Sequence, residues 1–283
     1  RRALRGFRRL GLDLGAAARK GALGLKARGG GPEPPPEPGP AAAALAASEI
    51  EARWRAVLGR AVPAVGLFLS PSRFLMEQLA RFGLPRERLR HLPLGLDPIS
   101  VERIPRRGPV RFAFFGTMAP HKGAHVLLEA FRGLAGRAAL ELHGGAAYDP
   151  AYGRAIARLA REAGAHWHGA YAPDRLPGLL GACDCVVVPS LWYENSPLTL
   201  LQARQAGLPA VASDLGGMAE LAAAGGAWTF PAGDAAALRA LLAGLAAEPI
   251  LLENAVVPPV PTLEAYAAEV AGLYAGLIEA RHP

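Results

Sequence analysis

The chain has 283 residues, of which 51% are hydrophobic and 7% aromatic. This composition supplies the core of one large or two ordinary domains and excludes a chain that is disordered throughout. No run of eighteen uninterrupted apolar residues occurs, so the sequence predicts no membrane-spanning helix. The two cysteines, Cys183 and Cys185, lie too close in sequence for an ordinary disulfide, and we interpret them as inert core thiols of a cytoplasmic protein.

The positive charge is concentrated at the N-terminus. The whole chain carries a net charge of +7, whereas residues 1–28 alone hold nine basic side chains and one acid, Asp13, for a net charge of +8. Apolar residues recur there at intervals of three, four and seven, which favours an amphipathic helix. Such a helix packs on a domain or lies on an anionic membrane surface. No aromatic residue beyond Phe7 interleaves with the charge, so we expect no nucleic-acid binding.

The next segments differ in composition. Residues 29–40 contain only Gly, Pro and Glu and predict an extended loop, and residues 41–60 return to a helical pattern. A strand over 65–69, a helix over 72–82 and a strand over 89–94 follow. Residues 98–109 combine three prolines with arginines and are the best candidate for a linker.

Strands and helices alternate regularly from residue 110 to residue 248. The predicted strands are 110–115, 138–142, 165–168, 184–188, 209–212 and 227–230. The predicted helices are 122–136, 150–163, 174–182, 197–206, 216–224 and 234–247, and a last helix spans 262–281. Strands this apolar cannot face water on either side, so the pattern predicts a parallel sheet covered by helices on both faces. Ligands of such sheets bind at the carboxyl ends of the strands.

The loop after the first of these strands contains a candidate phosphate site. Gly116 and Thr117 end the strand, and Lys122 stands where we expect the next helix to begin. A glycine lets a ligand approach the backbone, and a lysine adds charge to the positive end of a helix. The alternative is a helix that happens to hold a lysine in its first turn. Lys122 is the only lysine after residue 28, which favours the phosphate site.

The loop after the fourth strand of this series is richer in polar groups. Ser196 is a candidate N-cap and Pro197 suits the first helical turn, so free amides there would face an anion. Glu194 could simply cap the helix or make a structural hydrogen bond. Its neighbours Trp192 and Tyr193 instead suggest contact with a sugar or a ring. Gln202 either points back toward this loop or is an ordinary exposed glutamine. His166 and His168 share one face of a strand without a third ligand, so we expect no metal.

Two stretches make the sequence resemble a known family. GTMAPHKGAHVLLEAF and GAYAPDRLPGLLGACDCVVVPSLWYENSPLTLLQARQAGLPAVASDLGGMAEL resemble the donor-binding domain of glycosyltransferase family 4, which has a glycosyl transferases group 1 domain. These are retaining enzymes with the GT-B fold of two facing Rossmann-like domains. FLSPSRFLMEQLARFGLPRERLRHLPLGLDP resembles the end of the family's first domain.

The resemblance implies an α/β protein of GT-B type in four parts. Residues 1–64 hold the basic helix, the loop and a helix of an incomplete N-terminal domain, and residues 65–104 are the end of that acceptor domain. Residues 105–255 form a complete Rossmann-like donor-binding domain, and the helix within 256–283 packs back across the linker. We therefore expect the chain to lack the start of its N-terminal domain.

The resemblance also implies the site residues. Lys122 matches the lysine that contacts the donor diphosphate, and Glu194 matches a glutamate that contacts the donor sugar, so both are candidate catalytic residues. Two positions depart from the family, because Thr117 replaces a frequent arginine and Gln202 replaces the glutamate that holds the ribose. The full donor-binding set comprises Gly116, Thr117, Lys122, Gly169, Tyr171, Glu194, Asn195, Ser196, Pro197, Leu198 and Gln202.

The implied reaction moves a sugar from a nucleotide diphosphate donor to a carbohydrate or lipid-linked acceptor hydroxyl and retains the anomeric configuration. It needs no metal or other cofactor, and a role in bacterial polysaccharide or glycoconjugate synthesis follows from the family. Two alternatives remain open. One is a nucleotide-sugar-binding protein without transferase activity, and the other is a basic protein that contacts the inner face of the membrane through residues 1–28.

Overall fold

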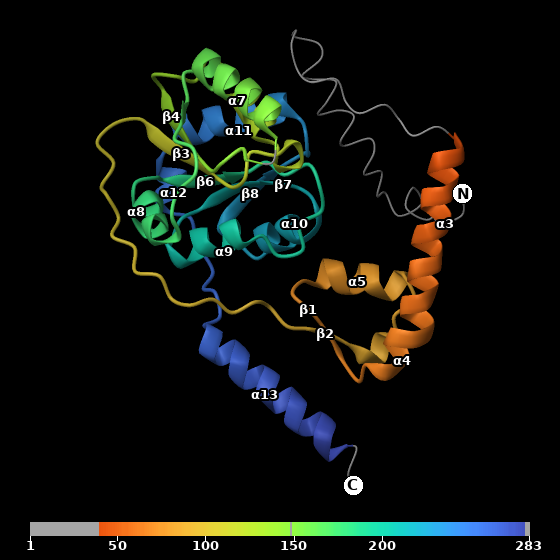
Figure 1. The fold of residues 1–283 in the computed structure, drawn as a ribbon. Coiled ribbons are helices and arrows are strands. Elements are labelled where there is room, and N and C mark those ends of the chain that lie inside the picture. The colour runs from red at the N-terminus through yellow and green to blue at the C-terminus, as the bar shows by residue number, and fades with distance from the viewer. Residues whose placement is uncertain (1–39, 148, 281–283) are drawn as a thin grey trace.

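The largest part of the molecule is a six-stranded parallel sheet with the order β5-β4-β3-β6-β7-β8 (Figure 1). The structure, a computed structural model, describes residues 40–147 and 149–280, so the predicted helix 1–28 and loop residues 29–39 lie outside it. The strands are β3 Val110–Phe115, β4 Ala138–His143, β5 His166–Trp167, β6 Cys185–Val188, β7 Ala210–Ser213 and β8 Ala227–Phe230. All six predicted strands are confirmed, with small shifts at their ends.

Helices cover both faces of this sheet because its strands are apolar on both faces. On β3, Phe112 and Phe114 belong to the core beneath α6, α7 and α11, whereas Ala113 and Phe115 belong to the core beneath α8, α9 and α10. The helices are α6 Ala124–Phe131, α7 Pro150–Ala163, α8 Leu176–Gly181, α9 Leu198–Gln205, α10 Gly216–Ala223 and α11 Ala235–Ala247. The predicted α/β fold class is thereby confirmed.

Three predictions about helix boundaries are wrong. Lys122 does not begin a helix, because it ends the short 3-10 turn Pro120–Lys122, and Gly123 with a φ of 73° separates it from α6. The predicted helix 122–136 also ends early, since the extended ψ of 127° at Arg132 interrupts it. Ser196 is not the N-cap of α9, because the extended residue before the helix is Pro197 and no side chain caps it.

The N-terminal part forms a second, smaller sheet. Strands β1 Phe68–Ser70 and β2 Leu89–His91 pair in parallel, with Phe68 beside Leu89, and α5 Arg73–Arg81 connects them. The predicted helix 41–60 is α3 Pro40–Ala56 and the π-helical turn Val57–Ala61, followed by α4 Val62–Ala64. No helix among residues 40–147 and 149–280 is long and apolar enough to cross a membrane.

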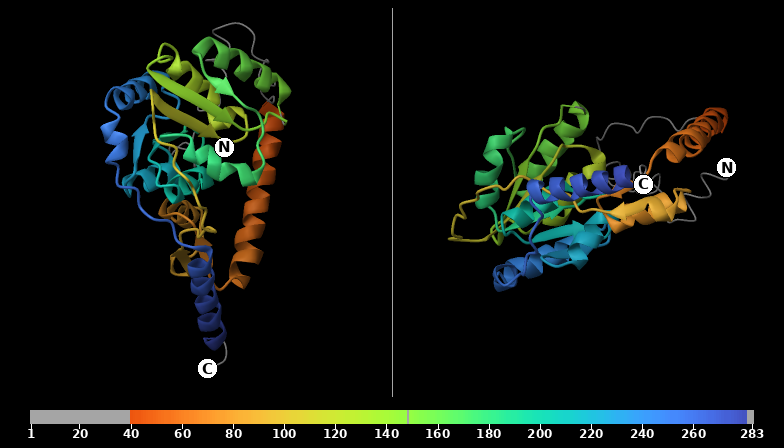
Figure 2. Two further views of the ribbon diagram at one scale, coloured as in Figure 1. Left: turned by 90° about the vertical axis from the view of Figure 1, so that its left-hand side faces the viewer. Right: turned by 90° about the horizontal axis from the view of Figure 1, so that it is seen from below.

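The chain returns to this N-terminal part at its end. After α12 Ile250–Glu253, helix α13 Leu263–Glu279 projects away from the six-stranded sheet (Figures 1 and 2). Leu96 pairs with Thr262 at the start of α13, and a Cβ on Gly95 would lie 2.5 Å from the Tyr266 Cβ. Arg90 of β2 forms an exposed ion pair with Glu269. The last helix therefore contacts residues that precede the predicted linker.

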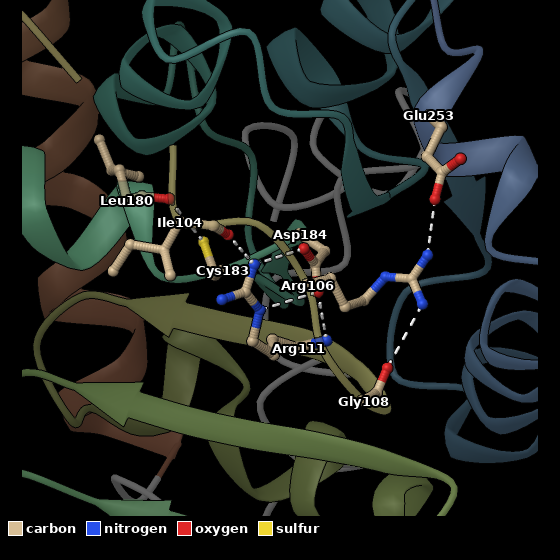
Figure 3. Close-up of polar contacts among 8 residues, drawn as sticks. All are labelled: Ile104, Arg106, Gly108, Arg111, Leu180, Cys183, Asp184 and Glu253. Carbon is tan, nitrogen blue, oxygen red and sulfur yellow. Dashed lines mark hydrogen bonds and ion pairs between the residues drawn. The ribbon is translucent and has the colours of Figure 1, made fainter. Parts of the chain in front are cut away.

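The end of the linker is fastened to the larger domain by two arginines (Figure 3). The Arg106 guanidinium lies 2.6 Å from Glu253. The Arg111 guanidinium contacts both carboxylate oxygens of Asp184, at 3.0 and 2.7 Å, and also donates to the Ile104 carbonyl. Since Arg111 and Asp184 stand at the starts of the neighbouring strands β3 and β6, this pair holds the linker at the edge opposite the carboxyl ends of the strands.

A glutamate on α10, in the larger domain, caps helix α5 of the N-terminal part. The backbone N–H groups of Arg73 and Phe74 donate to the two carboxylate oxygens of Glu220, at 2.9 and 2.8 Å. The imidazole of His91 lies 3.8 Å from the same carboxylate. A helix start has unpaired N–H groups and a partial positive charge, both of which a carboxylate stabilises. Glu220 therefore fixes α5 against the larger domain.

Replacing Glu220 by alanine is expected to loosen this contact. The variant leaves two helix-start amides without their acceptor, a loss of about 1 kcal/mol for a cap of this kind. Hydrogen exchange of the Arg73 and Phe74 amides should become faster by about fivefold. The control is Glu77→Ala on the same helix, which removes an exposed ion pair with Arg86 beyond the end of α5 and should leave these two amides unchanged. Equal exchange in both variants would contradict the capping role.

Candidate functional site

The candidate site lies at the point where the strand order of the sheet reverses direction. Successive strands run from β3 outward to β5, and the chain then crosses back to place β6 beside β3. Loops that follow two such neighbouring strands diverge and leave a crevice, which is where ligands bind in open α/β sheets. Here the two loops contain Lys122 after β3 and Glu194 after β6. They are joined by a hydrogen bond of 2.7 Å from the Leu191 N–H to the His121 carbonyl.

Lys122 and Glu194 are in direct contact between these two loops. The Lys122 ammonium lies 2.6 Å from Glu194 Oε1, and the two side chains are 30% and 14% exposed. The Trp192 indole N–H donates to the same oxygen at 2.8 Å, and the Ser190 hydroxyl donates to it at 3.1 Å. The Trp192 ring also packs on His121, with 4.1 Å between centroids. The two candidate catalytic residues thus form one polar cluster.

This cluster keeps Glu194 ionised. Burial raises the pKa of Glu194, but hydrogen bonds from Lys122 and Trp192, the charge of Lys122 and the Ser190 hydroxyl together lower it below its ordinary value. Burial and the Lys122 charge lower the pKa of His121. At neutral pH Glu194 is therefore a carboxylate and His121 a neutral imidazole.

The loops after β3, β4 and β5 meet beside this cluster. The Gly144 N–H donates to the Gly169 carbonyl at 2.7 Å, and the Gly116 N–H donates to the His143 carbonyl at 3.0 Å. A Cβ on Gly144 would lie 1.8 Å from the Gly116 carbonyl oxygen, so only glycine permits this approach. The backbone at Gly116 and Gly169 is therefore held together through a third glycine, which the sequence analysis did not single out.

Aromatic rings form a wall on these same loops. The Phe115 and His143 rings stack with 5.1 Å between centroids, and His143 stacks on His168 at 4.7 Å. Tyr171 packs its ring edge-on against both Phe115 and His143, and burial raises the pKa of its hydroxyl. Tyr171 was predicted from the sequence, whereas His143 was not, since an isolated histidine at a strand end has no distinctive spacing.

The segment from Asn195 to Leu198 leads into α9. The Thr199 hydroxyl donates to the Phe115 carbonyl at 3.3 Å, which ties the start of α9 to the end of β3. The N–H groups of Leu198 and Thr199 donate to no backbone carbonyl of the described residues. Ser196 is half-buried and Asn195 is exposed. Unpaired amides at this helix start are suited to an anion.

The loop that holds Glu194 also contacts the N-terminal part. The ring of Tyr193 stacks on that of Phe74 in α5, with 5.1 Å between centroids and an angle of 9°. The Gly217 N–H donates to the Glu194 carbonyl at 2.8 Å. The position of Glu194 thus depends on α5 and α10 as well as on its own strand.

Two predicted residues stand apart from the cluster. Thr117 is exposed on its loop, and Gln202 is half-buried one turn into α9. No side-chain hydrogen bond of the described residues joins either of them to Lys122 or Glu194. His166 and His168 lie near one another, as their spacing predicts, and both contact the carboxylate of Glu141, at 3.3 and 2.5 Å.

Sequence comparison identifies the larger domain. Residues 109–248 match the family described as Glycosyl transferases group 1. This range begins one residue before β3 and ends just after α11, so it contains the whole six-stranded sheet and both loops of the crevice. A search of curated proteins finds no match.

Solved structures resemble the chain beyond this domain. The Anabaena protein HepE, in complex with UDP and glucose, has a TM-score of 0.69 at 18% identity over 80% of this chain and 67% of its own. A glycosyltransferase from Rickettsia africae has a TM-score of 0.64 at 14% identity over 80% and 67%. Sucrose-phosphate synthase from Thermosynechococcus elongatus has a TM-score of 0.63 at 22% identity over 75% and 58%. Residues 109–248 therefore belong to the glycosyl transferases group 1 family, and the chain has the GT-B fold of the glycosyltransferases that it resembles.

Proposed function

We propose that the chain binds a nucleotide diphosphate sugar in the crevice between the loops after β3 and β6 and transfers the sugar to an acceptor hydroxyl with retention of configuration. The observation that carries this proposal is the contact between Lys122 and Glu194 at the point where the strand order reverses. That point is the usual ligand site of such sheets. Retention and a role in polysaccharide or glycoconjugate synthesis follow from the family resemblance.

The two residues suit opposite ends of the donor. As the bond between the sugar carbon and the diphosphate breaks, negative charge builds on the departing diphosphate. The Lys122 ammonium and the unpaired amides at the start of α9 would stabilise that charge in place, which lowers the barrier electrostatically. Glu194 would accept hydrogen bonds from sugar hydroxyls. Phe115 and His143 are buried, so the half-buried Tyr171, which packs edge-on against both, is the ring of this group that would contact the base.

Titration calorimetry of UDP, GDP and ADP with the full chain tests this proposal. UDP is the first probe, because HepE was solved with UDP and with glucose. One nucleoside diphosphate should bind with one site per chain and should compete with its nucleotide sugar. Transfer to an acceptor, with the product anomer identified by NMR, then tests retention. Failure to bind any of the three nucleotides would overturn the proposal.

A nucleotide-sugar-binding protein without transferase activity is the second candidate. Thr117 and Gln202, the two positions that depart from the family, favour it, because each replaces a charged side chain by a neutral one. Donor binding without turnover in the experiment above would select this candidate.

Replacing Gln202 by glutamate is expected to tighten donor binding by about tenfold. A carboxylate accepts from both ribose hydroxyls, and hydrogen bonds to charged groups contribute about 1.5–3 kcal/mol against about 1 kcal/mol for neutral ones. The control is Gln205→Glu, which adds the same charge to α9 at a residue whose amide donates to the Asp97 carbonyl. Calorimetry with UDP compares the two variants. An unchanged or weaker constant for Gln202→Glu would mean that Gln202 does not contact the ribose.

A further inference from the structure

The Glu194 carboxylate is held asymmetrically. Lys122, Trp192 and Ser190 all donate to Oε1, at 2.6, 2.8 and 3.1 Å. Oε2 accepts no hydrogen bond from a side chain of the described residues. One oxygen of a carboxylate offers about two lone-pair directions, so three donors occupy Oε1 fully. Oε2 is therefore the oxygen that remains for a ligand.

The three hydrogen-bond donors to Oε1 would respond differently when a nucleotide diphosphate sugar binds. Lys122 carries the only ammonium of the cluster, and a diphosphate in the crevice would attract it away from Glu194. Trp192 and Ser190 are neutral and have no such second partner. Once Lys122 has turned to the diphosphate, the indole N–H at 2.8 Å and the hydroxyl at 3.1 Å are the donors that still hold Oε1.

Trp192 is itself fixed well enough to do this. Its ring packs on His121, with 4.1 Å between centroids, and lies 5.7 Å from the Lys122 ammonium. Leu191, the residue before Trp192, is held by the hydrogen bond from its backbone N–H to the His121 carbonyl. The ring is nevertheless 42% exposed, so its burial explains little of its placement. An exposed indole whose N–H points at the half-buried Glu194 carboxylate indicates a polar role.

We propose that Trp192 is a positioning residue for Glu194, whose indole N–H holds Oε1 so that Oε2 faces the donor sugar, above all after Lys122 has turned to the diphosphate. This inference rests on the proposed function. It predicts that loss of the Trp192 N–H affects recognition of the sugar and not recognition of the nucleotide, because this N–H donates to Glu194, whereas it is the ring that lies near Lys122.

The protonation of Glu194 gives an independent readout. The indole hydrogen bond is one of the causes that lower the pKa of Glu194, together with Lys122 and Ser190 and against the effect of burial. The charged or titratable groups that face it are Lys122 and His121. Removing the indole N–H raises the pKa of Glu194. Because sugar recognition needs the carboxylate, the loss of activity toward low pH should then begin at a higher pH.

The test is Trp192→Phe, which keeps an aromatic ring and removes the N–H. Calorimetry measures dissociation constants for UDP and for UDP-glucose, and kinetics measure the pH profile of transfer. UDP affinity should stay within about twofold, and UDP-glucose affinity should fall about tenfold, as expected for one lost hydrogen bond to a charged group. Ser190→Ala should change the same ratio in the same direction by a smaller factor, since its bond is longer.

The matched control is Trp54→Phe, which removes an indole hydrogen bond of 2.9 Å to the Phe82 carbonyl in the N-terminal part. It should change neither constant. An unchanged ratio in Trp192→Phe, or equal losses for UDP and UDP-glucose, would overturn the positioning role while leaving the proposed function intact. Wild-type protein that binds neither probe would overturn the proposed function and this inference with it.

Discussion

Replacing Lys122 by alanine is expected to weaken UDP binding by about tenfold to a hundredfold. One hydrogen bond between an ammonium and a phosphate contributes about 1.5–3 kcal/mol, and each 1.4 kcal/mol corresponds to a factor of ten. The variant also leaves the Glu194 carboxylate, 14% exposed, without its cation. An unpaired negative charge in the crevice repels a diphosphate, which adds to the loss. Titration calorimetry at fixed ionic strength measures the effect.

The control for Lys122→Ala is Arg158→Ala. Arg158 forms an ion pair with Glu162 on the outer side of α7, so its removal takes one cation from the same domain without touching the crevice. It should leave UDP affinity unchanged. If the two variants weaken binding equally, the effect is one of overall charge and Lys122 has no specific contact with the diphosphate.

Loss of Lys122 should also change how stability depends on pH. The folded state lowers the pKa of Glu194, so this carboxylate adds stability above its ordinary pKa, and the contribution disappears as the pH falls through the lowered value. Without Lys122 the pKa rises toward or above its ordinary value. The difference in unfolding free energy between wild type and Lys122→Ala should therefore be largest at neutral pH and shrink below about pH 4.

Replacing Gly123 by alanine is expected to have the largest effect on stability of the substitutions considered. Gly123 has a φ of 73°, where a side chain costs about 1–2 kcal/mol. A Cβ there would also lie 1.8 Å from the Pro189 carbonyl oxygen and 2.8 Å from its carbon. Both are backbone atoms, so the loops after β3 and β6 must separate. We expect destabilisation of about 4 kcal/mol or more and loss of UDP binding, because Lys122 moves away from Glu194.

Gly133→Ala separates the two causes. Gly133 has a φ of 79°, nearly that of Gly123, but a Cβ there would have no atom within 4 Å. This variant pays only the backbone cost and should lower the melting temperature by about 2–8 °C, with UDP affinity unchanged. Thermal unfolding and calorimetry compare the pair. Similar melting temperatures for the two variants would mean that the loops tolerate separation and that their close approach does not shape the site.

Local pattern was sufficient for the elements of the larger domain. Apolar strands such as 110–115 and 138–142 are recognisable because a strand buried on both faces must be apolar at every position. The loops that contain Lys122 and Glu194 follow from the same rule, since chemistry gathers at the carboxyl ends of parallel strands. The exact starts of the helices were harder to predict from the sequence. Nothing in the sequence around Lys122 shows that the Pro189 carbonyl, 66 positions further along the chain than Gly123, leaves no room for a Cβ at that glycine.

The sequence by itself determined the α/β class, the order of the elements and the candidate pair of Lys122 and Glu194, because these depend on periodicity and on residue types within short windows. Only the tertiary structure decided that β6 returns to lie beside β3, which brings two residues 72 positions apart to 2.6 Å. It also decided that Glu220 caps α5 and that three donors share one oxygen of Glu194. Contacts between residues far apart in sequence leave no periodicity for a single sequence to display, so they become visible only when the chain is folded.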